Sequence, residues 1–316
     1  MRLLVTGGTG FIGRAACRTL DADGHTLVVL TRAPSASTSA RVRFVAWKPP
    51  ALSGHRPGGP PEPGAWEEEL ASAEGVINLA GESLVAKRWT TEQKTRLVDS
   101  RVGVTRALVE AMRRARQRPK IFIQASALGY YGSRGEEALH EAAPPGSDFL
   151  AHLCRQWEDA ARAAEPLGVR VVRLRFGMVL ARDGGALAHM LPPFRLGLGG
   201  PLGSGRQWVS WIHRDDLIAM MRWALHEAPR PPVGGAVNAT APNPVTMREF
   251  ANTLGRALHR PAVLPVPGLA LRVLLGDVAE MLLTGQRVVP SAALQAGFRF
   301  SYPTLSEALA AILQGG

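Results

Sequence analysis

The sequence predicts an α/β protein with a Rossmann-like doubly wound parallel sheet and a smaller mixed C-terminal lobe. Three observations carry this prediction. The chain opens with a short apolar strand, a glycine-rich turn, an amphipathic helix and a second strand within its first 32 residues. Strand and helix patterns then alternate up to about residue 180, which is typical of a parallel sheet. Beyond residue 180 the alternation stops, and glycine-rich and helical segments follow.

The spacing of apolar residues and the helix-ending residues predict the bounds of each element. Gly24, for example, follows the first helix as a residue after a C-cap does. Residues 49–64 hold six prolines and four glycines and predict a surface loop. We expect strands at 2–6, 25–30, 76–80, 120–126 and 169–174, and helices at 11–23, 91–116, 148–164, 246–259, 269–283 and 304–313.

Length and composition narrow the class of protein. The 316 residues suffice for a nucleotide-binding domain over residues 1–180 and a smaller lobe over 181–316. The sequence contains no run of about 18 apolar residues that could span a membrane, and its start does not resemble a signal peptide. We therefore expect a cytoplasmic protein. The two cysteines, Cys17 and Cys154, predict neither a disulfide framework nor a metal site.

The formal net charge of +11 raises the question of nucleic-acid binding. Only four of the 37 basic residues are lysine, and alanine, glycine and proline are abundant. This bias is typical of a GC-rich coding sequence, and the arginines are spread along the chain without an aromatic-interleaved stripe. We therefore expect no nucleic-acid partner and no membrane partner.

The turn after the first strand carries the glycine spacing of a dinucleotide site. Gly7 allows a sharp turn out of the strand, Gly10 leaves room for a pyrophosphate, and Gly13 lets the helix pack close to the strand. The N-terminus of the helix then offers unpaired N–H groups and a positive dipole end to phosphate.

The end of the second strand indicates which dinucleotide is bound. A site for NAD usually has an acidic residue here that accepts hydrogen bonds from the ribose 2′-hydroxyl. The chain has Thr31 and Arg32 instead, which donate hydrogen bonds, and a guanidinium suits a 2′-phosphate. The sequence therefore predicts NADP(H) as the cofactor.

Several further blocks give the chain a family resemblance. It resembles the extended and atypical short-chain dehydrogenase/reductases, and among them the epimerase-family proteins that have a small C-terminal domain of unknown function. The resemblance covers essentially the whole chain. The blocks are Gly-Gly-Thr-Gly-Phe-Ile-Gly at 7–13, Val-Leu-Thr-Arg at 29–32, Asn-Leu-Ala-Gly-Glu at 78–82, Ser-Arg at 100–101, Gly-Tyr-Tyr-Gly at 129–132, Trp-Glu at 157–158, the glycine-rich segment 192–205, Trp-Ile-His-Arg-Asp-Asp at 211–216 and Gly-Gln-Arg-Val-Val-Pro at 285–290.

The resemblance implies a role for each matching position. The glycine turn would hold the pyrophosphate, the end of the second strand would hold the 2′-phosphate, and residues after the third predicted strand would line the cofactor. Arg101 would reach the cofactor phosphates or ribose, and the loop containing Val179 would lie near the nicotinamide. The cofactor-binding residues implied are Gly7, Gly10, Phe11, Ile12, Gly13, Thr31, Arg32, Leu79, Ala80, Gly81, Arg101 and Val179.

The chain departs from the family in its acid–base residues. Relatives use a serine together with Tyr-x-x-x-Lys on one helix, where the lysine lowers the pKa of the tyrosine. Ser126 fits the serine, but alignment on Trp157-Glu158 places Leu150 and Cys154 near the other two positions. Tyr130 or Tyr131 in the adjacent loop can substitute as proton donor, and both can equally be packing residues.

Other residues leave alternatives open. His152 lies on the same helix, and His213 is followed by Asp215 and Asp216; each histidine can titrate near neutrality or be structural. Glu82 can face the cleft or cap a helix. Trp208 and Trp211 can stack on a substrate or pack in the core.

Two functions follow. The first is an NADP(H)-dependent oxidoreductase or nucleotide-sugar epimerase with a small-molecule substrate that the sequence does not identify. The second is a protein that binds or senses NADPH without turnover, which the missing Tyr-x-x-x-Lys favours. A homodimer through the helices at 91–116 and 148–164 is one arrangement open to the chain, because the apolar faces of these helices can pack against a second copy or against the core.

Overall fold

The computed structural model describes residues 1–34, 39–48, 64–226 and 233–314. Apart from Gly64, the loop expected at 49–64 lies outside these residues. In the described part, a seven-stranded parallel sheet has the order β11-β7-β5-β4-β1-β2-β3. Its strands are β1 (Arg2–Thr6), β2 (Thr26–Thr31), β3 (Val42–Ala46), β4 (Gly75–Asn78), β5 (Ile121–Ala127), β7 (Arg170–Phe176) and β11 (Gly235–Ala239).

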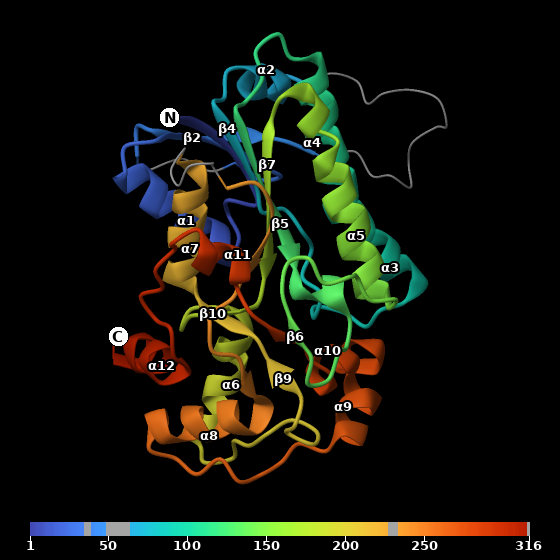
Figure 1. Cartoon of the computed structure of the whole chain (residues 1–316), viewed down its shortest axis with the longest axis vertical. Helices are drawn as coiled ribbons and strands as arrows, with labels where there is room; N and C mark the ends of the chain where they lie inside the picture. The colour runs from blue at the N-terminus through green and yellow to red at the C-terminus, as the bar shows by residue number, and fades with distance from the viewer. Residues whose placement is uncertain (35–38, 49–63, 227–232, 315–316) are drawn as a thin grey trace.

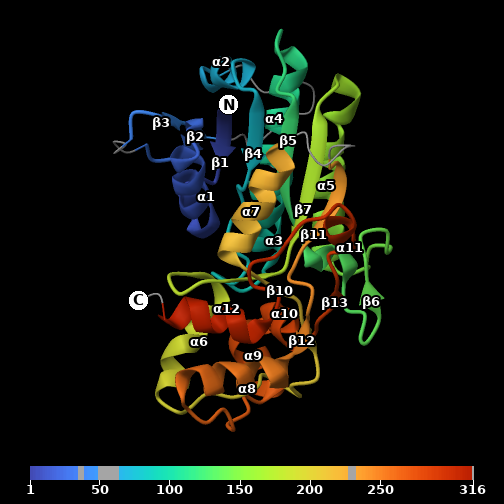
Figure 2. The same cartoon turned by 60° about the vertical axis from the view of Figure 1, so that its left-hand side comes forward.

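The predicted doubly wound sheet is confirmed, and its covering layers explain the apolar strands. Along β1 the side chains alternate: Leu3 and Val5 pack on one face, and Leu4 packs on the other. The first face is covered by α1 (Phe11–Ala22) and α7 (Arg214–Leu225). The second is covered by α2 (Trp66–Ala71), α4 (Val104–Arg114) and α5 (Phe149–Arg162), as Figures 1 and 2 show.

The chain reverses its direction of winding beside β1. From β1 it proceeds to β2 and β3 on one side, and then returns to β4 on the other. In open parallel sheets, ligands bind outside the carboxyl ends of the strands at such a switch point. The fold therefore places the site at the glycine turn after β1 and at the ends of β4, β5 and β7.

The helix expected at 91–116 is not continuous, so this prediction was wrong in its detail. The structure has α3 (Thr91–Val98), a π-helical turn over Asp99–Gly103, and then α4. The carbonyl of Arg101 in this turn accepts from the Val104 N–H and from the Thr105 hydroxyl, the latter at 2.8 Å. The side chain of Arg101 lies on the wall of a cavity.

The C-terminal lobe lies beyond the carboxyl ends of the strands (Figure 1). Apolar residues of α6, α8 and α12 form its core around Trp211 and Phe250. The helix expected at 269–283 is broken at Gly276, whose φ of 61° allows the turn. The helices are α6 (Gly185–Arg195), α8 (Met247–Leu258), α9 (Gly268–Leu275), α10 (Glu280–Leu283), α11 (Ser291–Gln295) and α12 (Leu305–Gln314). Three short strand pairs are also present in the described ranges: β8 (Met178–Leu180) with β10 (Trp211–His213), β9 (Trp208–Val209) with β12 (Val245–Thr246), and β6 (Ala138–Leu139) with β13 (Arg287–Val288).

Two segments after residue 180 return to the sheet. Helix α7 covers the face shared with α1, and β11 pairs with β7 as the edge strand. The domain boundary expected at residue 180 stays a prediction. The central sheet includes β11, which lies after that residue. None of the helices in the described ranges is long and apolar enough to cross a membrane.

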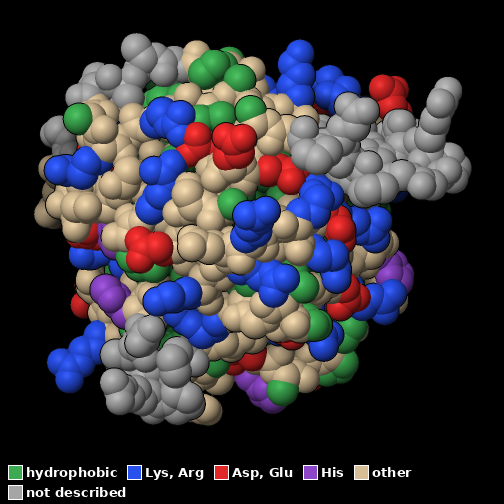
Figure 3. All heavy atoms as spheres, turned by 90° about the horizontal axis from the view of Figure 1, so that it is seen from above, with side chains coloured by type: hydrophobic (Ala, Val, Ile, Leu, Met, Phe, Trp, Pro, Cys, Tyr) green, Lys and Arg blue, Asp and Glu red, His purple; other side chains and the backbone are tan. Residues whose placement is uncertain are grey.

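Charged side chains of both signs lie on one end of the molecule. Viewed from the end at which the sheet strands begin, Figure 3 shows arginine and lysine side chains interspersed with aspartate and glutamate. The exposed positions of α5 are likewise polar, at His152, Arg155, Gln156 and Asp159. The apolar stripe of this helix faces the core, and the homodimer stays a prediction.

The core contact between α4 and the sheet can be tested at Leu108. This side chain is fully buried, and Leu108→Ala should lower the free energy of unfolding by about 2–5 kcal/mol, because it leaves a cavity against the strands. Urea unfolding measures the change. Leu196→Ala is the control, because Leu196 is 76% exposed and its truncation should change stability by less than about 0.5 kcal/mol. Equal losses in the two variants would contradict the packing described.

Candidate functional site

The turn after β1 contains two glycines at positions that have no room for a side chain. Gly7 has a φ of 68°, and a Cβ there would lie 2.5 Å from the Leu79 carbonyl oxygen. A Cβ on Gly13 would collide with the carbonyl oxygen of Gly7. Because these glycines have no side chain, the N-terminus of α1 can lie directly against the ends of β1 and β4.

Gly10 begins α1 and leaves that helix end open. It is the N-cap residue, and no side chain of the described residues caps the helix. A Cβ on Gly10 would have only the Gly7 carbonyl oxygen as a close neighbour, at 3.2 Å. The first N–H groups of α1 and their positive dipole end are therefore available to an anion.

Thr31 and Arg32 lie at the end of β2, beside the glycine turn. β2 pairs with β1 in parallel register, with Leu30 opposite Thr6. The hydroxyl of Thr31 accepts from the Ala33 N–H at 3.3 Å, and Arg32 is exposed. The guanidinium of Arg32 makes no ion pair with any residue in the described ranges. A guanidinium therefore lies at the strand end where an adenosine 2′-phosphate is expected.

A cavity of about 470 Å³ opens at the carboxyl ends of β4, β5 and β7. This volume falls within the range of small-molecule sites. Its wall includes Ser126 and half of the predicted cofactor residues, namely Ile12, Leu79, Ala80, Gly81, Arg101 and Val179. The other half, Gly7, Gly10, Phe11, Gly13, Thr31 and Arg32, lies outside this wall, toward the ends of β1 and β2.

Arg101 is a buried cation on the cavity wall. It donates to the carbonyl oxygens of Glu82 (2.8 Å) and Leu97 (3.3 Å) and to the Ser100 hydroxyl (3.3 Å). No carboxylate of the described residues lies within ion-pair distance, and burial lowers the pKa of the guanidinium from its usual value. A Cβ on Gly81 would lie 3.1 Å from the guanidinium carbon, so the glycine admits Arg101 to the wall.

Ser126 is held by a buried carboxylate. Its hydroxyl donates to Glu158 at 2.7 Å, and the Glu158 side chain is only 3% exposed. Arg175 donates to both oxygens of that carboxylate, at 2.7 and 2.9 Å, and Arg173 donates at 3.3 Å. Because the proton of Ser126 is directed to Glu158, the hydroxyl oxygen is left to accept hydrogen bonds from the cavity.

Neither tyrosine of the adjacent loop lies on the cavity wall. The Tyr131 hydroxyl accepts from Arg175 at 2.8 Å and donates to Asn238 at 2.7 Å, and burial raises its pKa. The Tyr130 ring stacks on Arg175, whose guanidinium carbon is 3.5 Å from the ring centroid. The structure thus places both tyrosines behind Ser126, in contact with its supporting arginine.

Leu150 and Cys154 of α5 take the wall positions next to Ser126. Desolvation raises the pKa of Cys154 to about 12, so the thiol is neutral. Helix α5 therefore presents a leucine and an uncharged thiol to the cavity, at the positions that the family resemblance assigned to tyrosine and lysine.

The remaining sequence candidates have local roles. His152 is exposed on α5. His213 accepts from the Asp215 N–H at 3.1 Å as the N-cap of α7, and burial lowers its pKa. Asp216 accepts from the N–H groups of Ser301 and Tyr302. Glu82 accepts from Gln93 and pairs with Arg96, and Trp211 donates to the Asn243 carbonyl; Trp208 alone of these lies on the cavity wall.

Sequence reasoning missed the support of Ser126 and most of the lobe side of the cavity. Glu158 follows Cys154 by four residues, so both lie on the inward face of α5, and this spacing was the available signal. The lobe contributes Gln207, Met247, Met281, Leu282 and Thr284, for which no motif gave a signal, and Gln286, which lies in the block at 285–290 but was given no role.

Comparison with known proteins identifies the family. Residues 3–239 match the NAD dependent epimerase/dehydratase family, and residues 266–312 match a domain of unknown function, DUF1731. The chain belongs to the NAD dependent epimerase/dehydratase family. The resemblance inferred from the sequence blocks is thereby confirmed.

Two relatives within this family align along the whole chain. The epimerase family protein SDR39U1 homolog, chloroplastic, of Arabidopsis thaliana is 42% identical over 99% of this chain and 87% of its own length. The crystal structure of human epimerase family protein SDR39U1 (isoform 2) with NADPH is 36% identical, covers 100% of both chains and has a TM-score of 0.85.

A third relative in the family is longer. The nucleoside-diphosphate sugar epimerase from Corynebacterium glutamicum is 31% identical, with a TM-score of 0.74. It aligns with 99% of this chain but only 58% of its own.

The hydroxyl of Tyr131 should stabilise the protein, and that of Tyr130 should not. Tyr131→Phe removes the donor to the buried Asn238 Oδ1 and one of the acceptors of Arg175, and should cost about 1–3 kcal/mol of unfolding free energy in urea titrations. Tyr130→Phe is the matched control, because its hydroxyl makes no hydrogen bond within the described part of the chain. Equal stability of the two variants would contradict the network.

Proposed function

We propose that the protein binds NADP(H). The human relative crystallised with NADPH aligns over the full chain, and the glycine turn, the open end of α1 and Arg32 lie in order along the carboxyl edge of the sheet. The adenosine 2′-phosphate would meet Thr31 and Arg32, the pyrophosphate would meet Gly10 and α1, and the nicotinamide end would enter the cavity beside Val179.

We further propose that the protein is an oxidoreductase acting on a small molecule. One observation carries this proposal: a single cavity extends from Ile12 on the cofactor side, past Ser126, to Met281 and Gln286 of the lobe. The bound cofactor would supply or accept the hydride. Ser126 would hold the reacting oxygen of the substrate, and Glu158 would fix the direction of the serine proton.

A second candidate is an NADPH-binding protein without turnover. Leu150 and Cys154 favour it, because neither can donate a proton readily to a substrate oxygen at neutral pH. A nucleotide-sugar epimerase is a third use of the same cavity, and the cytoplasmic location expected from the sequence stays a prediction.

Arg32→Ala tests the cofactor assignment. Loss of a charge-assisted contact to the 2′-phosphate should raise the Kd for NADPH about tenfold to hundredfold and leave the Kd for NADH within about twofold. Quenching of protein fluorescence on titration measures both. Arg18→Ala, an exposed position on α1, should change neither value. Equal affinity of the wild type for NADPH and NADH would overturn the assignment.

Ser126→Ala tests turnover. With NADPH-loaded protein and a panel of neutral ketones and aldehydes, the variant should oxidise NADPH at least about tenfold more slowly, while the Kd for NADPH stays the same. Absorbance of NADPH follows the reaction. Wild-type protein that oxidises NADPH with no member of the panel would support the binding protein instead.

A further inference from the structure

The lobe end of the cavity is mainly apolar. The wall here is formed by Trp208, Val209, Met247, Met281 and Leu282, which face Leu128 and Leu150 of the sheet domain. This end is where a substrate would lie if the cofactor enters beside Val179, so the inference rests on the proposed function. Apolar walls favour ligands that lose little hydration on binding.

Most polar side chains at this end direct their donors into the protein. Four of them are thereby spent on protein oxygens, and the amide of Gln286 is the side-chain donor at this end for which the described residues show no such bond. The bonds run from Ser210 Oγ to the Gln286 carbonyl (2.8 Å), from Thr284 Oγ1 to the Glu280 carbonyl (2.6 Å), from Trp208 Nε1 to Glu136 (2.9 Å), and from Gln207 Nε2 to the Leu202 and Leu282 carbonyls (3.0 and 2.8 Å).

Cations are scarce on the same wall. Arg101 is the one lysine or arginine among the described residues that line the cavity, and it lies beside Gly81 on the cofactor side. Gln286 offers the lobe end an uncharged amide. A diphosphate is normally held by arginine, lysine or a helix N-terminus, and burying its charges without such partners is costly.

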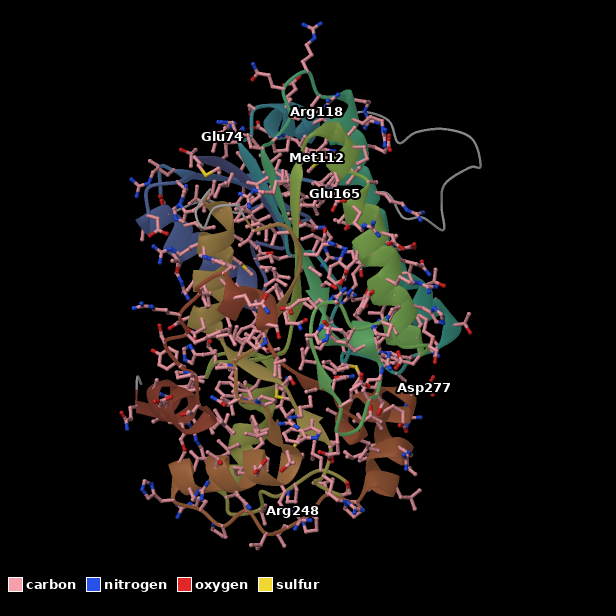
Figure 4. The ribbon with its side chains drawn as sticks, viewed as in Figure 1. Glu74, Met112, Arg118, Glu165, Arg248 and Asp277 are labelled. Carbon is pink, nitrogen blue, oxygen red and sulfur yellow. The ribbon has the colours of Figure 1, made fainter. Side chains whose placement is uncertain are left out.

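An adjoining pocket of about 290 Å³ adds negative charge. It shares Gly129, Leu150, Met281, Thr284 and Gln286 with the main cavity, so the two are neighbours. Its charged side chains are Asp148, Asp277, Glu280 and Lys94. The ammonium of Lys94 is already paired with Asp277 at 2.8 Å (Asp277 is labelled in Figure 4), and Glu280 is paired with Arg272 at 2.9 Å, so Asp148 is the carboxylate of this pocket that has no ion pair among the described residues. A phosphate entering here would be repelled.

We propose that the substrate is an uncharged, largely apolar alcohol, or the carbonyl compound derived from it, and that nucleoside diphosphate sugars are excluded. The hydroxyl of such an alcohol can donate to Ser126, because Ser126 keeps its oxygen free to accept. Oxidation of the alcohol carbon would transfer a hydride to NADP⁺ and release the hydroxyl proton; the reverse reaction takes both up.

The test compares 1-phenylethanol with UDP-glucose as probes. Saturation-transfer NMR on the wild-type protein, with and without NADP⁺, should give a Kd for 1-phenylethanol at least about tenfold lower than that for UDP-glucose. Equal or tighter binding of UDP-glucose would overturn the proposal, and so would binding of neither probe. Failure of NADP⁺ to bind would remove the proposed function, while the comparison in free protein would still decide the substrate class.

Met281 provides a variant with a matched control. Met281→Lys places a cation at the lobe end and should weaken 1-phenylethanol at least about tenfold, while Met281→Leu should stay within about twofold. A folded Met281→Lys that binds 1-phenylethanol normally would overturn the placement of the site, and the wild-type comparison stands if the variant does not fold.

Arg287 directly follows Gln286 of the cavity wall in the sequence and provides a second check. It is not among the residues that line either cavity, and its guanidinium carbon lies 4.8 Å from the Trp208 ring centroid. Arg287→Ala should leave the preference for 1-phenylethanol unchanged. If the wild type binds UDP-glucose and Arg287→Ala does not, the proposal is overturned.

Discussion

The buried carboxylate of Glu158 is the contact on which the candidate site depends. It lies on α5 and joins Ser126 at the end of β5 to Arg173 and Arg175 of β7. A carboxylate that is 3% exposed is tolerated only when its oxygens are satisfied, and here they accept from two arginines and a hydroxyl. Removal of either side would leave an uncompensated charge between the helix and the sheet.

The same network reaches the edge of the sheet and the lobe. Arg175 donates to Tyr131, and Tyr131 donates to Asn238 of β11, whose amide donates to the Val289 carbonyl beyond β13. The segment that carries Gln286 is thus attached to the strands that carry Ser126. The two halves of the cavity are held in one arrangement by hydrogen bonds, although they are far apart in sequence.

The parts of the fold that residues close in sequence determine could be predicted from the sequence. The first 32 residues could be predicted because glycines, strand and helix follow one another within one βαβ unit, and the fold class and family are confirmed. The π-helical turn at Arg101 could not be predicted, because an apolar period of 3.6 does not show one extra residue in a turn.

The support of Ser126 was missed for a different reason. Glu158 and Arg175 meet only through the pairing of α5 with β7, and no local pattern records which partner a charged residue will find. The return of β11 to the sheet is similarly a matter of long-range pairing. The assignments of Tyr130, Tyr131 and the cofactor residues remain proposals, and the structure separates those on the cavity wall from those behind it.

The charges around Cys154 explain why α5 carries no lysine at the position that the family resemblance assigns to one. Cys154 already lies in the field of Arg101 and Arg175, and only one carboxylate, Glu158, is close to it. A lysine at this position would add a fourth cation to a site that already holds Arg101, Arg173 and Arg175, two of which share the carboxylate of Glu158. A tyrosine at Leu150 would then have no lysine to lower its pKa. Retaining Arg175 as the support of Ser126 therefore favours a neutral residue at 154.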